Sequence, residues 1–425
     1  MKVIQSFWSK PSNNKSEDPN SRYKGGWLHQ KHAFYSQALS CLTFKQFYDQ
    51  VELYTDADGK HLLIDILDIP YTNVHITLDQ IDKYNSKLWA LGKIFTYAEQ
   101  NEPFIHCDSD VFIWKKLPEL LTTSPLFAQN AEINFPAYEE ALNDVFINFD
   151  WIPTELINSL YKNKGIHALN AGIIGGQETH FFKKLKEQVL EFIEKNDHLL
   201  DKIDIGIFNT IFEQQLAFAI AEKNNIPVSY YLENVDSDFS KVINFHTVPF
   251  QSQYVHCIGY AKKSFFACEQ VEARLKYHFP EFYDKLNNRL AKYFDENSFQ
   301  SDITPERMDF LFNLYDWVSN KSVDDISNTT FKLNPSCKII EENDSYFLEH
   351  IIPQTKNFQR QELKDWNVIL LYFEEPTTIN QLYEDLSEDE NFLKNTNKET
   401  LKDKLISFVM DKTMLLEILQ PISTY

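Results

Sequence analysis

Hydrophobic and polar positions in the first part of the chain alternate between strand-like and helix-like patterns. Apolar and β-branched runs predict strands at residues 51–55 and 74–78, and helical spacing predicts helices at residues 32–47 and 61–66. Strands that alternate with helices are typical of a mainly parallel sheet with helices on both faces. We therefore expect an α/β fold in which ligands bind beyond the carboxyl ends of the strands.

One strand-like run leads directly into two aspartates. Residues 103–105 are Pro-Phe-Ile, and two residues further on stand Asp108-Ser109-Asp110. Residues i and i+2 of a strand point to the same side, so both carboxylates can reach one cation. Hard cations such as Mg²⁺ and Mn²⁺ take oxygen ligands and share their shell with substrate phosphates. The alternative is that the aspartates only form the turn that ends the strand.

Two other polar segments bear on a ligand pocket. A second Asp-x-Asp, Asp56-Ala57-Asp58, is followed by Gly59 and fits a turn better than a metal site. Residues 10–26 are polar and contain a Gly25-Gly26 pair, which predicts a loop over a nucleotide pocket or, alternatively, a disordered surface loop.

Composition narrows the class of function. The chain has 425 residues, enough for two or three domains. A formal net charge of −21 argues against binding to nucleic acids and to anionic membranes, since both need clustered Lys and Arg. Five cysteines without paired spacing fit reduced thiols. Because the N-terminus has no long apolar segment and no apolar run reaches about 18 residues, we expect a cytoplasmic protein.

Four segments occur in the order found in GT-A-type glycosyltransferases, especially those related to family 8. The first, Met1 to Trp8, resembles the strand that leads into the nucleotide-holding loop, and the second, residues 84–94, precedes the Asp-x-Asp strand. The third, residues 167–176, resembles the family's Asn-x-Gly segment beside the donor sugar. The fourth, residues 255–262, resembles the His-x-x-Gly-x-x-Lys segment that supplies a third metal ligand and a lysine for the diphosphate.

The resemblance implies a GT-A fold and a metal-dependent transferase that uses a nucleotide sugar, expected to be a UDP-sugar. It implies that Mn²⁺ or Mg²⁺ is held by Asp108, Asp110 and His256. The residues expected to contact the nucleotide sugar are Phe7, Trp8, Lys87, Asp108, Gly172, Gly259 and Lys262. The sequence departs from family 8 after this last lysine, where Lys263-Ser264 stands in place of the usual Pro-Trp.

The residue types in the fourth segment suit this chemistry. A neutral imidazole such as that of His256 is a common metal ligand. Gly259 lets the backbone approach a phosphate, and Lys262 supplies a point charge. The alternatives are a hydrogen-bonded core histidine and a solvated surface lysine.

Three residues are candidates for catalysis: Glu213 and Gln214, which begin a helix-like run, and Asn170 of the third segment. In an inverting enzyme, the Glu213 carboxylate would deprotonate the acceptor. Gln214 does not titrate and would only stabilise charge or steer the attack in a retaining enzyme. Alternatively, Glu213 is an acidic residue favoured by the dipole at a helix start.

The pattern changes in the last quarter of the chain, after a polar stretch at residues 319–330 that is the best linker candidate. Turn formers between β-prone runs predict a hairpin within residues 331–350, and helices are expected at residues 364–373, after Thr377-Thr378, and at residues 398–410. This order resembles the winged-helix domain of the PqqD type, which recognises leader peptides of ribosomally made, modified peptides.

Three parts of the chain are therefore expected: a GT-A domain at residues 1–270, a helical extension and linker at residues 271–325, and a winged-helix domain at residues 326–425. The resemblance implies that a leader peptide adds as a strand to the hairpin edge and packs on the last helix. The residues expected to bind it are Tyr346, Phe347, Leu348, Leu401, Leu405 and Phe408. Alternatively, the tail is a packing or dimerisation module.

The sequence thus predicts a hexosyltransferase-type enzyme that moves a sugar from a UDP-sugar to a precursor peptide recruited by the C-terminal domain. A second hypothesis keeps the transferase but gives it a glycan or lipid-linked acceptor and a structural tail. A third makes the protein a non-catalytic peptide-binding scaffold.

Overall fold

A computed structural model describes the chain except for residues 14–21, 234, 236–238, 240, 295–299, 394–397 and 423–425. The chain divides into two compact units. The first unit comprises residues 1–243, 254–263 and 274–300, and the second comprises residues 244–253, 264–273 and 301–425. The expected boundary after residue 270 falls inside the helix α10 (Phe265–His278), whose two parts belong to different units.

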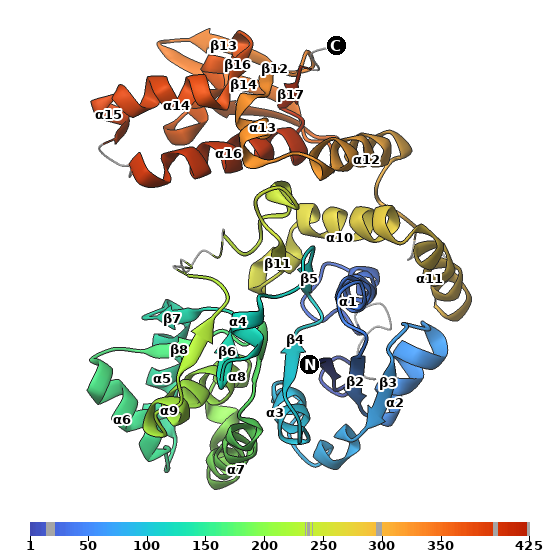
Figure 1. The fold of residues 1–425 in the computed structure, drawn as a ribbon, viewed down its shortest axis with the longest axis vertical. Coiled ribbons are helices and arrows are strands. Elements are labelled where there is room, and N and C mark those ends of the chain that lie inside the picture. The colour runs from blue at the N-terminus through green and yellow to red at the C-terminus, as the bar shows by residue number, and fades with distance from the viewer. Residues whose placement is uncertain are drawn as a thin grey trace. The chain divides into compact units, whose positions relative to one another are not determined.

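The first unit is built on a seven-stranded, mainly parallel sheet (Figure 1). Across the sheet lie β10 (Val228–Tyr230), β6 (Leu126–Ala128), β9 (Ile173–Gly176), β4 (Phe104–Cys107), β1 (Lys2–Phe7), β2 (Val51–Thr55) and β3 (Asn73–Ile76). The strand β9 runs antiparallel to both of its neighbours, whereas the other pairs are parallel. This confirms the expected α/β class with a mainly parallel sheet.

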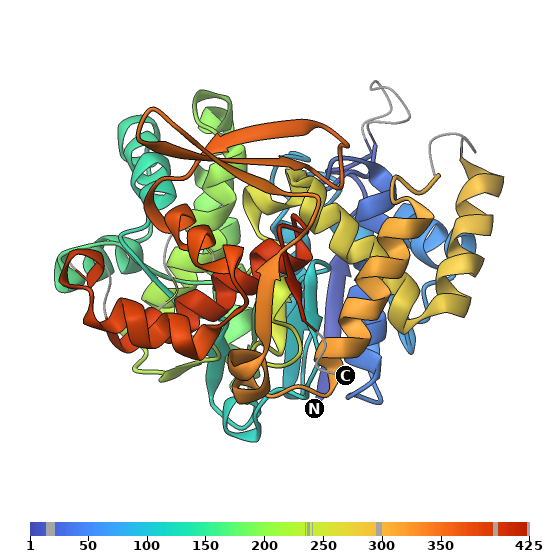
Figure 2. The same cartoon turned by 90° about the horizontal axis from the view of Figure 1, so that it is seen from above.

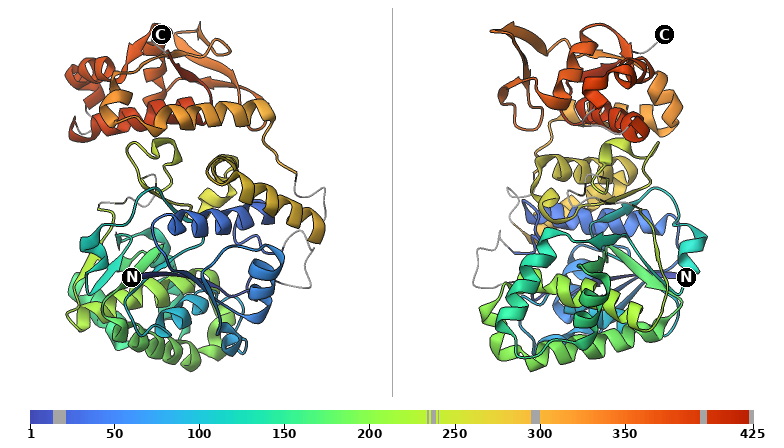
Figure 3. Two further views of the ribbon diagram at one scale, coloured as in Figure 1. Left: turned by 45° about the vertical axis from the view of Figure 1, so that its right-hand side comes forward. Right: turned by 90° about the vertical axis from the view of Figure 1, so that its left-hand side faces the viewer.

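Helices cover both faces of this sheet, as Figure 3 shows from two further sides. Successive side chains of β1 point to opposite faces. Ile4 belongs to a buried cluster with α3 (Leu91–Ala98) and α7 (Thr179–Lys195), whereas Gln5 donates a hydrogen bond to Ser40 of α1 (Gln30–Lys45). The remaining helices of this unit are α2 (Ala57–Lys60), α4 (Glu119–Thr122), α5 (Pro136–Asn148), α6 (Thr154–Asn163), α8 (Ile205–Thr210), α9 (Leu216–Lys223) and α11 (Pro280–Tyr293).

Strand direction brings three loops to one end of the sheet. Because β1 and β4 are parallel neighbours, Trp8 and Asp108, which follow them, lie at the same carboxyl end. The strand β9 runs the other way and its first residue pairs with Cys107, so the residues just before β9 also lie at that end. Two short antiparallel pairs extend the region: β5 (Val111–Ile113) with β11 (Tyr254–His256), and β7 (Ala131–Ile133) with β8 (His167–Leu169).

The second unit contains two three-stranded sheets and helices. One sheet has the order β16 (Thr377–Thr378), β12 (Thr330–Leu333) and β17 (Leu419–Pro421). The other is a meander of β13 (Lys338–Glu342), β14 (Ser345–Ile351) and β15 (Phe358–Glu362), drawn in orange in Figure 2. The helices are α12 (Pro305–Ser319), α13 (Val323–Asn328), α14 (Ile379–Glu388), α15 (Glu390–Leu393) and α16 (Lys398–Met414).

Two expectations for the tail need correction. The linker predicted at residues 319–330 contains α13, whose start is fixed by reciprocal bonds between Ser322 and Asp325. The strand β14 is the centre of its meander and is paired on both sides, so a peptide cannot add as a strand along Tyr346 to His350. Within the part of the chain that the structure describes, the unpaired edges of this sheet belong to β13 and β15.

Half of the residues expected to bind a peptide are core residues instead. Leu348, Leu401 and Leu405 are at most 1% exposed and belong to the buried cluster of the second unit. Tyr346 is exposed, and Phe347 and Phe408 are half-buried. Apolar helical spacing in the sequence marks the face that packs on the core as readily as a face that binds a partner, because both bury the same stripe.

Candidate metal centre

Two strands bring three metal-ligand side chains together. Asp108 follows β4 directly, and Asp110 precedes β5. The strand β5 pairs with β11 in a register that sets Val111 opposite His256, which places the imidazole beside Asp110. A backbone bond of 3.0 Å from the amide of Cys257 to the carbonyl of Asp110 closes this pairing. The sequence separation of the ligands is therefore bridged by a single strand register.

The three side chains have the spacing of a cation site. The Nε2 atom of His256 lies 3.4 Å from Asp110 Oδ1 and 3.9 Å from Asp108 Oδ2, and one ligand atom from each residue lies within 4.8 Å of the others. A cation bonded at about 2.1 Å to each ligand would hold the three atoms about 3 Å apart. Small side-chain movements would thus complete the coordination.

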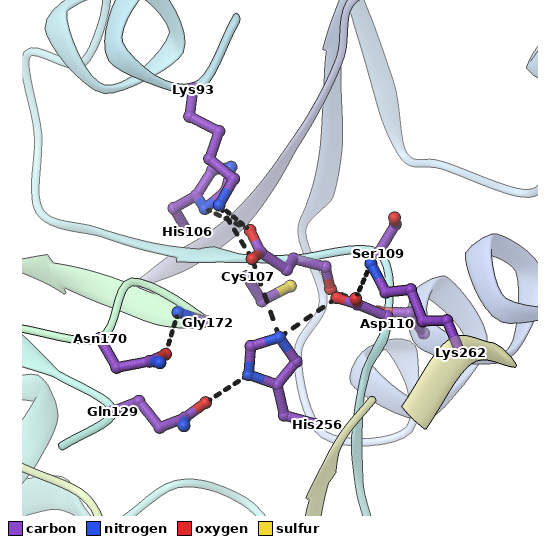
Figure 4. Close-up of polar contacts among 12 residues, drawn as sticks. Lys93, His106, Cys107, Ser109, Asp110, Gln129, Asn170, Gly172, His256 and Lys262 are labelled. Carbon is purple, nitrogen blue, oxygen red and sulfur yellow. Dashed lines mark hydrogen bonds and ion pairs between the residues drawn. The ribbon is translucent and has the colours of Figure 1, made fainter. Parts of the chain in front are cut away.

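The hydrogen bonding of His256 favours a metal-binding tautomer. Its Nδ1 atom lies 2.7 Å from Gln129 Oε1, while Gln129 Nε2 donates to Asn130 Oδ1 at 2.9 Å. With the amide in this orientation, Nδ1 carries the proton and Nε2 presents a lone pair to the two carboxylates. Figure 4 shows Gln129 and Asp110 on opposite sides of the imidazole. Three acceptors that converge on one point are the arrangement that a cation satisfies.

Two lysines neutralise the carboxylates. The Nζ atom of Lys262 lies 2.5 Å from Asp110 Oδ2, and Nζ of Lys93, on α3, lies 2.8 Å from Asp108 Oδ1 and 3.0 Å from Glu213 Oε1. Burial by itself would raise the pKa of Asp110, but Lys262 and His256 outweigh it and hold that pKa below its usual range. Burial raises the pKa of Asp108, and Lys93 only partly opposes this.

The centre opens into a cavity of about 1440 Å³ in the first unit. Five lysines and three carboxylates line it, an excess of positive charge in a chain whose net charge is −21. The lining charged residues are Lys10, Lys24, Lys87, Lys93, Lys262, Asp108, Asp110 and Glu132. A basic cavity with a divalent cation at one wall attracts a polyanion such as a diphosphate.

The cavity collects most of the residues predicted from the sequence. Beyond the three candidate metal ligands, these are Phe7, Trp8, Lys87, Asn170, Gly172, Gln214, Gly259 and Lys262. Parts of the loop expected at residues 10–26 also line the cavity, namely residues 10–13 and 24–26. Residues 14–21 of that loop lie outside the described residues.

The Asn-x-Gly segment is held against the metal centre by its own backbone. Asn170 Oδ1 accepts a bond of 2.9 Å from the amide of Gly172, whose carbonyl accepts a bond of 2.9 Å from the amide of Asp108. A Cβ atom on Gly172 would lie 2.4 Å from His256 Nδ1. Glycine is therefore required for the imidazole to sit beside this turn.

Glu213 does not reach the cavity. It is fully buried, and Oε1 binds Lys93 and accepts a bond of 3.0 Å from the hydroxyl of Tyr97. A carboxylate in this position cannot take a proton from an acceptor in the cavity, so the expectation that it serves as a base is replaced by a supporting role for Lys93. The neighbouring Gln214 does line the cavity.

Sequence reasoning missed Lys93, Gln129, Glu132 and Tyr138. Lys87, the lysine expected to contact the nucleotide sugar, lines the cavity, but Lys93 is the lysine that contacts Asp108. A signal was present in the sequence, because Lys93 is the single charged residue within the apolar helix α3. A charge on a buried face requires a partner.

The second Asp-x-Asp, which was predicted to form a turn, begins the short helix α2 instead. Asp56 caps α2 by accepting the amide of Gly59 at 2.8 Å, and its other oxygen accepts the amide and hydroxyl of Ser9. Asp58 is exposed. Within the described residues, neither belongs to a group of metal-ligand side chains.

These features define an α/β protein with a buried Asp-Asp-His site of metal-ligand type in a basic cavity. Residues 1–289 match a family described as "Family of unknown function (DUF6734)", and the chain belongs to this family. No match was found among curated proteins. Among the described residues, no helix is both long and apolar enough to cross a membrane.

Proposed function

We propose that the protein is a metal-dependent glycosyltransferase that moves a sugar from a UDP-sugar onto a ribosomally synthesised peptide. The observation that carries the proposal is the convergence of Asp108, Asp110 and the Nε2 lone pair of His256 at the carboxyl end of the sheet, inside a basic cavity. This is where ligands bind in open α/β sheets. The arrangement supports a GT-A fold for the first unit.

The bound ion would be Mn²⁺ or Mg²⁺. Two carboxylates and one imidazole give three protein ligands, and both ions complete their shells with phosphate oxygens and water. When bound, the ion would neutralise charge on the diphosphate leaving group.

The residues of the chain would do the rest of the work on the donor. Lys93 contacts Asp108 and Lys262 contacts Asp110, so their ammonium groups would lie within a few ångströms of a diphosphate held on the ion. Preorganised charges of this kind stabilise a leaving group without reorganisation during the reaction. Phe7 and Trp8 would contact the nucleotide, and Asn170, Gly172 and Gln214, which line the same cavity, would contact the sugar.

The acceptor proposal rests on the second unit. The meander, the capped helix α14 and the helix α16 follow the order of a PqqD-like winged-helix domain. A peptide would add to the free edge of β13 or β15, because main-chain bonding at a sheet edge is a general mode of peptide recognition. The cysteines remain thiols, which fits a reaction in the cytoplasm.

A second candidate is favoured by one observation. Leu348, Leu401 and Leu405 are packed in the core of the second unit and are not available to bind a peptide. In the second candidate function, this unit is therefore purely structural, and the acceptor is a glycan or a lipid-linked sugar. Mass spectrometry of a precursor peptide incubated with enzyme, Mn²⁺ and UDP-sugars separates the two candidates. A hexose-sized mass increase supports the peptide, and an unmodified peptide beside a modified glycan supports the alternative.

The transferase proposal predicts a specific loss of turnover. Asp110→Asn should lower UDP release from UDP-sugars by at least about a hundredfold, because the cation loses one of its charged ligands. The matched control is Asp58→Asn, an exposed aspartate in the second Asp-x-Asp, which should release UDP at the wild-type rate. Equal rates in wild type and Asp110→Asn would refute the metal-dependent mechanism.

A further inference from the structure

A buried carboxylate on the cavity wall lies outside the metal centre. Glu132, on β7, is 3% exposed yet lines the cavity. Its Oε1 accepts a bond of 2.7 Å from Asn170 Nδ2, and its Oε2 accepts a bond from the hydroxyl of Tyr138. A carboxylate has about four acceptor positions, so two remain beyond these contacts. Burying such a group is costly unless those positions are used.

The hydrogen bonds of Glu132 depend on how the protons of its neighbours Tyr138 and Gln214 are arranged. The Tyr138 hydroxyl meets Glu132 Oε2 and also lies 3.0 Å from Gln214 Oε1, but a phenol has only one proton to donate. Either Glu132 carries a proton, or the Gln214 amide turns its NH₂ group toward Tyr138. Burial raises the pKa of Glu132, against the opposing effect of its bonds to Asn170 and Tyr138. The cluster can thus present donors or acceptors to a ligand.

The position of the cluster relative to the metal centre is fixed by a short chain of bonds. Glu132 bonds to Asn170, Asn170 bonds to the amide of Gly172, and the carbonyl of Gly172 bonds to the amide of Asp108. A diphosphate held on the cation carries its sugar on the next atom outward. Asn170 and Glu132, which follow Asp108 and Gly172 in this series of hydrogen bonds, both line the cavity.

We propose that Glu132 binds a hydroxyl group of the transferred sugar and, with Tyr138 and Gln214, determines which hexose the site accepts. This inference rests on the proposed function, because the cation and diphosphate set the position of the sugar. A buried site that hydrogen-bonds a hydroxyl discriminates strongly against ligands that lack it, since its polar groups are then left unpaired. In this proposal the metal centre binds the diphosphate, and the Glu132 cluster selects the sugar.

The test compares nucleotide and nucleotide-sugar binding by calorimetry in the presence of Mn²⁺. The ligands are UDP, UDP-glucose, UDP-galactose and UDP-N-acetylglucosamine, and the proteins are wild type, Glu132→Gln and Tyr138→Phe. We expect one UDP-sugar to bind the wild type more tightly than UDP does. In Glu132→Gln, affinity for UDP should change less than about twofold, whereas the advantage of that sugar should fall about tenfold or more.

Each other result has a defined meaning. If UDP does not bind the wild type with Mn²⁺, the proposed function fails, and this inference fails with it. If UDP binds but no sugar adds affinity, or the preference survives in Glu132→Gln, the inference is wrong and the metal-dependent nucleotide site stands. Equal losses for UDP and UDP-sugar would mean a purely structural role. If Glu132→Gln does not fold, Tyr138→Phe decides by the same comparison.

Discussion

The imidazole of His256 depends on a residue that is not itself a ligand. Gln129 Oε1 accepts the Nδ1 proton at 2.7 Å and also accepts a bond of 2.5 Å from the hydroxyl of Tyr254. Partners of this kind fix the tautomer and ring orientation of metal-bound histidines. The candidate metal site therefore extends one layer beyond Asp108, Asp110 and His256.

Replacing Gln129 should weaken metal binding without removing a ligand. Gln129→Leu is expected to lower Mn²⁺ affinity about tenfold to a hundredfold, because the imidazole is no longer held in the tautomer that turns Nε2 to the carboxylates. Mn²⁺ titration followed by electron paramagnetic resonance measures this. Gln188→Leu, an amide on α7 outside the cavity lining, should keep wild-type affinity. Unchanged affinity in Gln129→Leu would show that the orientation of His256 has another source.

A second histidine, His278, should make the free energy of unfolding depend on pH. The Nε2 atom of His278 accepts a bond of 3.2 Å from the indole N–H of Trp114, which requires a neutral ring. Burial, helped by Arg274, lowers the pKa of His278 to about 4 from its ordinary value of 6.5. The unfolded chain therefore takes up the proton first as the pH falls. The stability that this residue contributes is complete above about pH 6.5 and is lost between there and about pH 4.

The expected size of this effect is about 2 kcal/mol of unfolding free energy between pH 7 and pH 5. Urea unfolding at both pH values should show that loss in the wild type and a smaller loss in His278→Gln, whose amide can still accept from Trp114. The same pH dependence in both proteins would mean that His278 is protonated in the folded state at pH 5.

At the residue level, the sequence predicted the candidate metal ligands better than the residues that hold them in position. Asp108 and Asp110 were marked by their place after a strand-like run, although they lie in the turn between β4 and β5 and not within one strand. His256 was marked by the segment around it. Gln129 and Glu132 carry no such mark, since their roles arise when β6, β7 and β11 meet in space. The register of β5 with β11 places His256 beside Asp110, but the contact of the imidazole with Gln129, which follows β6, appears only in the folded structure.

The helix α3 carries a buried charge that two other elements share. Lys93 Nζ bridges Asp108, after β4, and Glu213, in the helical turn Ile211–Gln215. Burial lowers the pKa of Lys93, but the two carboxylates more than offset this and raise it overall. Glu213 is fully buried, so water cannot solvate its charge if Lys93 is removed.

Breaking this bridge should destabilise the first unit. Lys93→Met leaves two buried carboxylates without their cation and is expected to cost about 3–5 kcal/mol of unfolding free energy. Adding Glu213→Gln removes one of the unpaired charges and should recover part of the loss, which denaturant unfolding of both variants measures. Lys184→Met on α7, where the lysine is exposed, should cost little. A single variant as stable as the wild type would show that α3 does not need this ion pair.

The elements of the first unit were predicted more successfully than those of the second. Strands at residues 51–55 and 74–78 and a helix at residues 32–47 correspond to β2, β3 and α1, because local periodicity and burial agree there. In the tail, one hairpin was expected where a three-stranded meander forms. The hairpin turn, Asn343-Asp344 with positive φ at both residues, was signalled locally, but the pairing of β15 was not.

At the scale of the whole molecule, the charge of the cavity is opposite in sign to the net charge of the chain. A chain of net charge −21 keeps an excess of lysines over carboxylates in one cavity, and the candidate metal-binding carboxylates Asp108 and Asp110 lie among them. Holding like charges together in a cavity costs stability, and proteins keep such clusters where a ligand balances them. This contrast separates the candidate site from the rest of the acidic chain.

The measurement that tests the central claim most directly is calorimetric titration of the whole protein with UDP, with Mn²⁺ and then with EDTA in its place. The account predicts that UDP binds with Mn²⁺, that EDTA lowers its affinity by at least about tenfold, and that Asp108→Asn removes the Mn²⁺-dependent gain. UDP binding of equal strength with EDTA, or an undiminished Mn²⁺ effect in Asp108→Asn, would contradict a nucleotide site built on Asp108, Asp110 and His256.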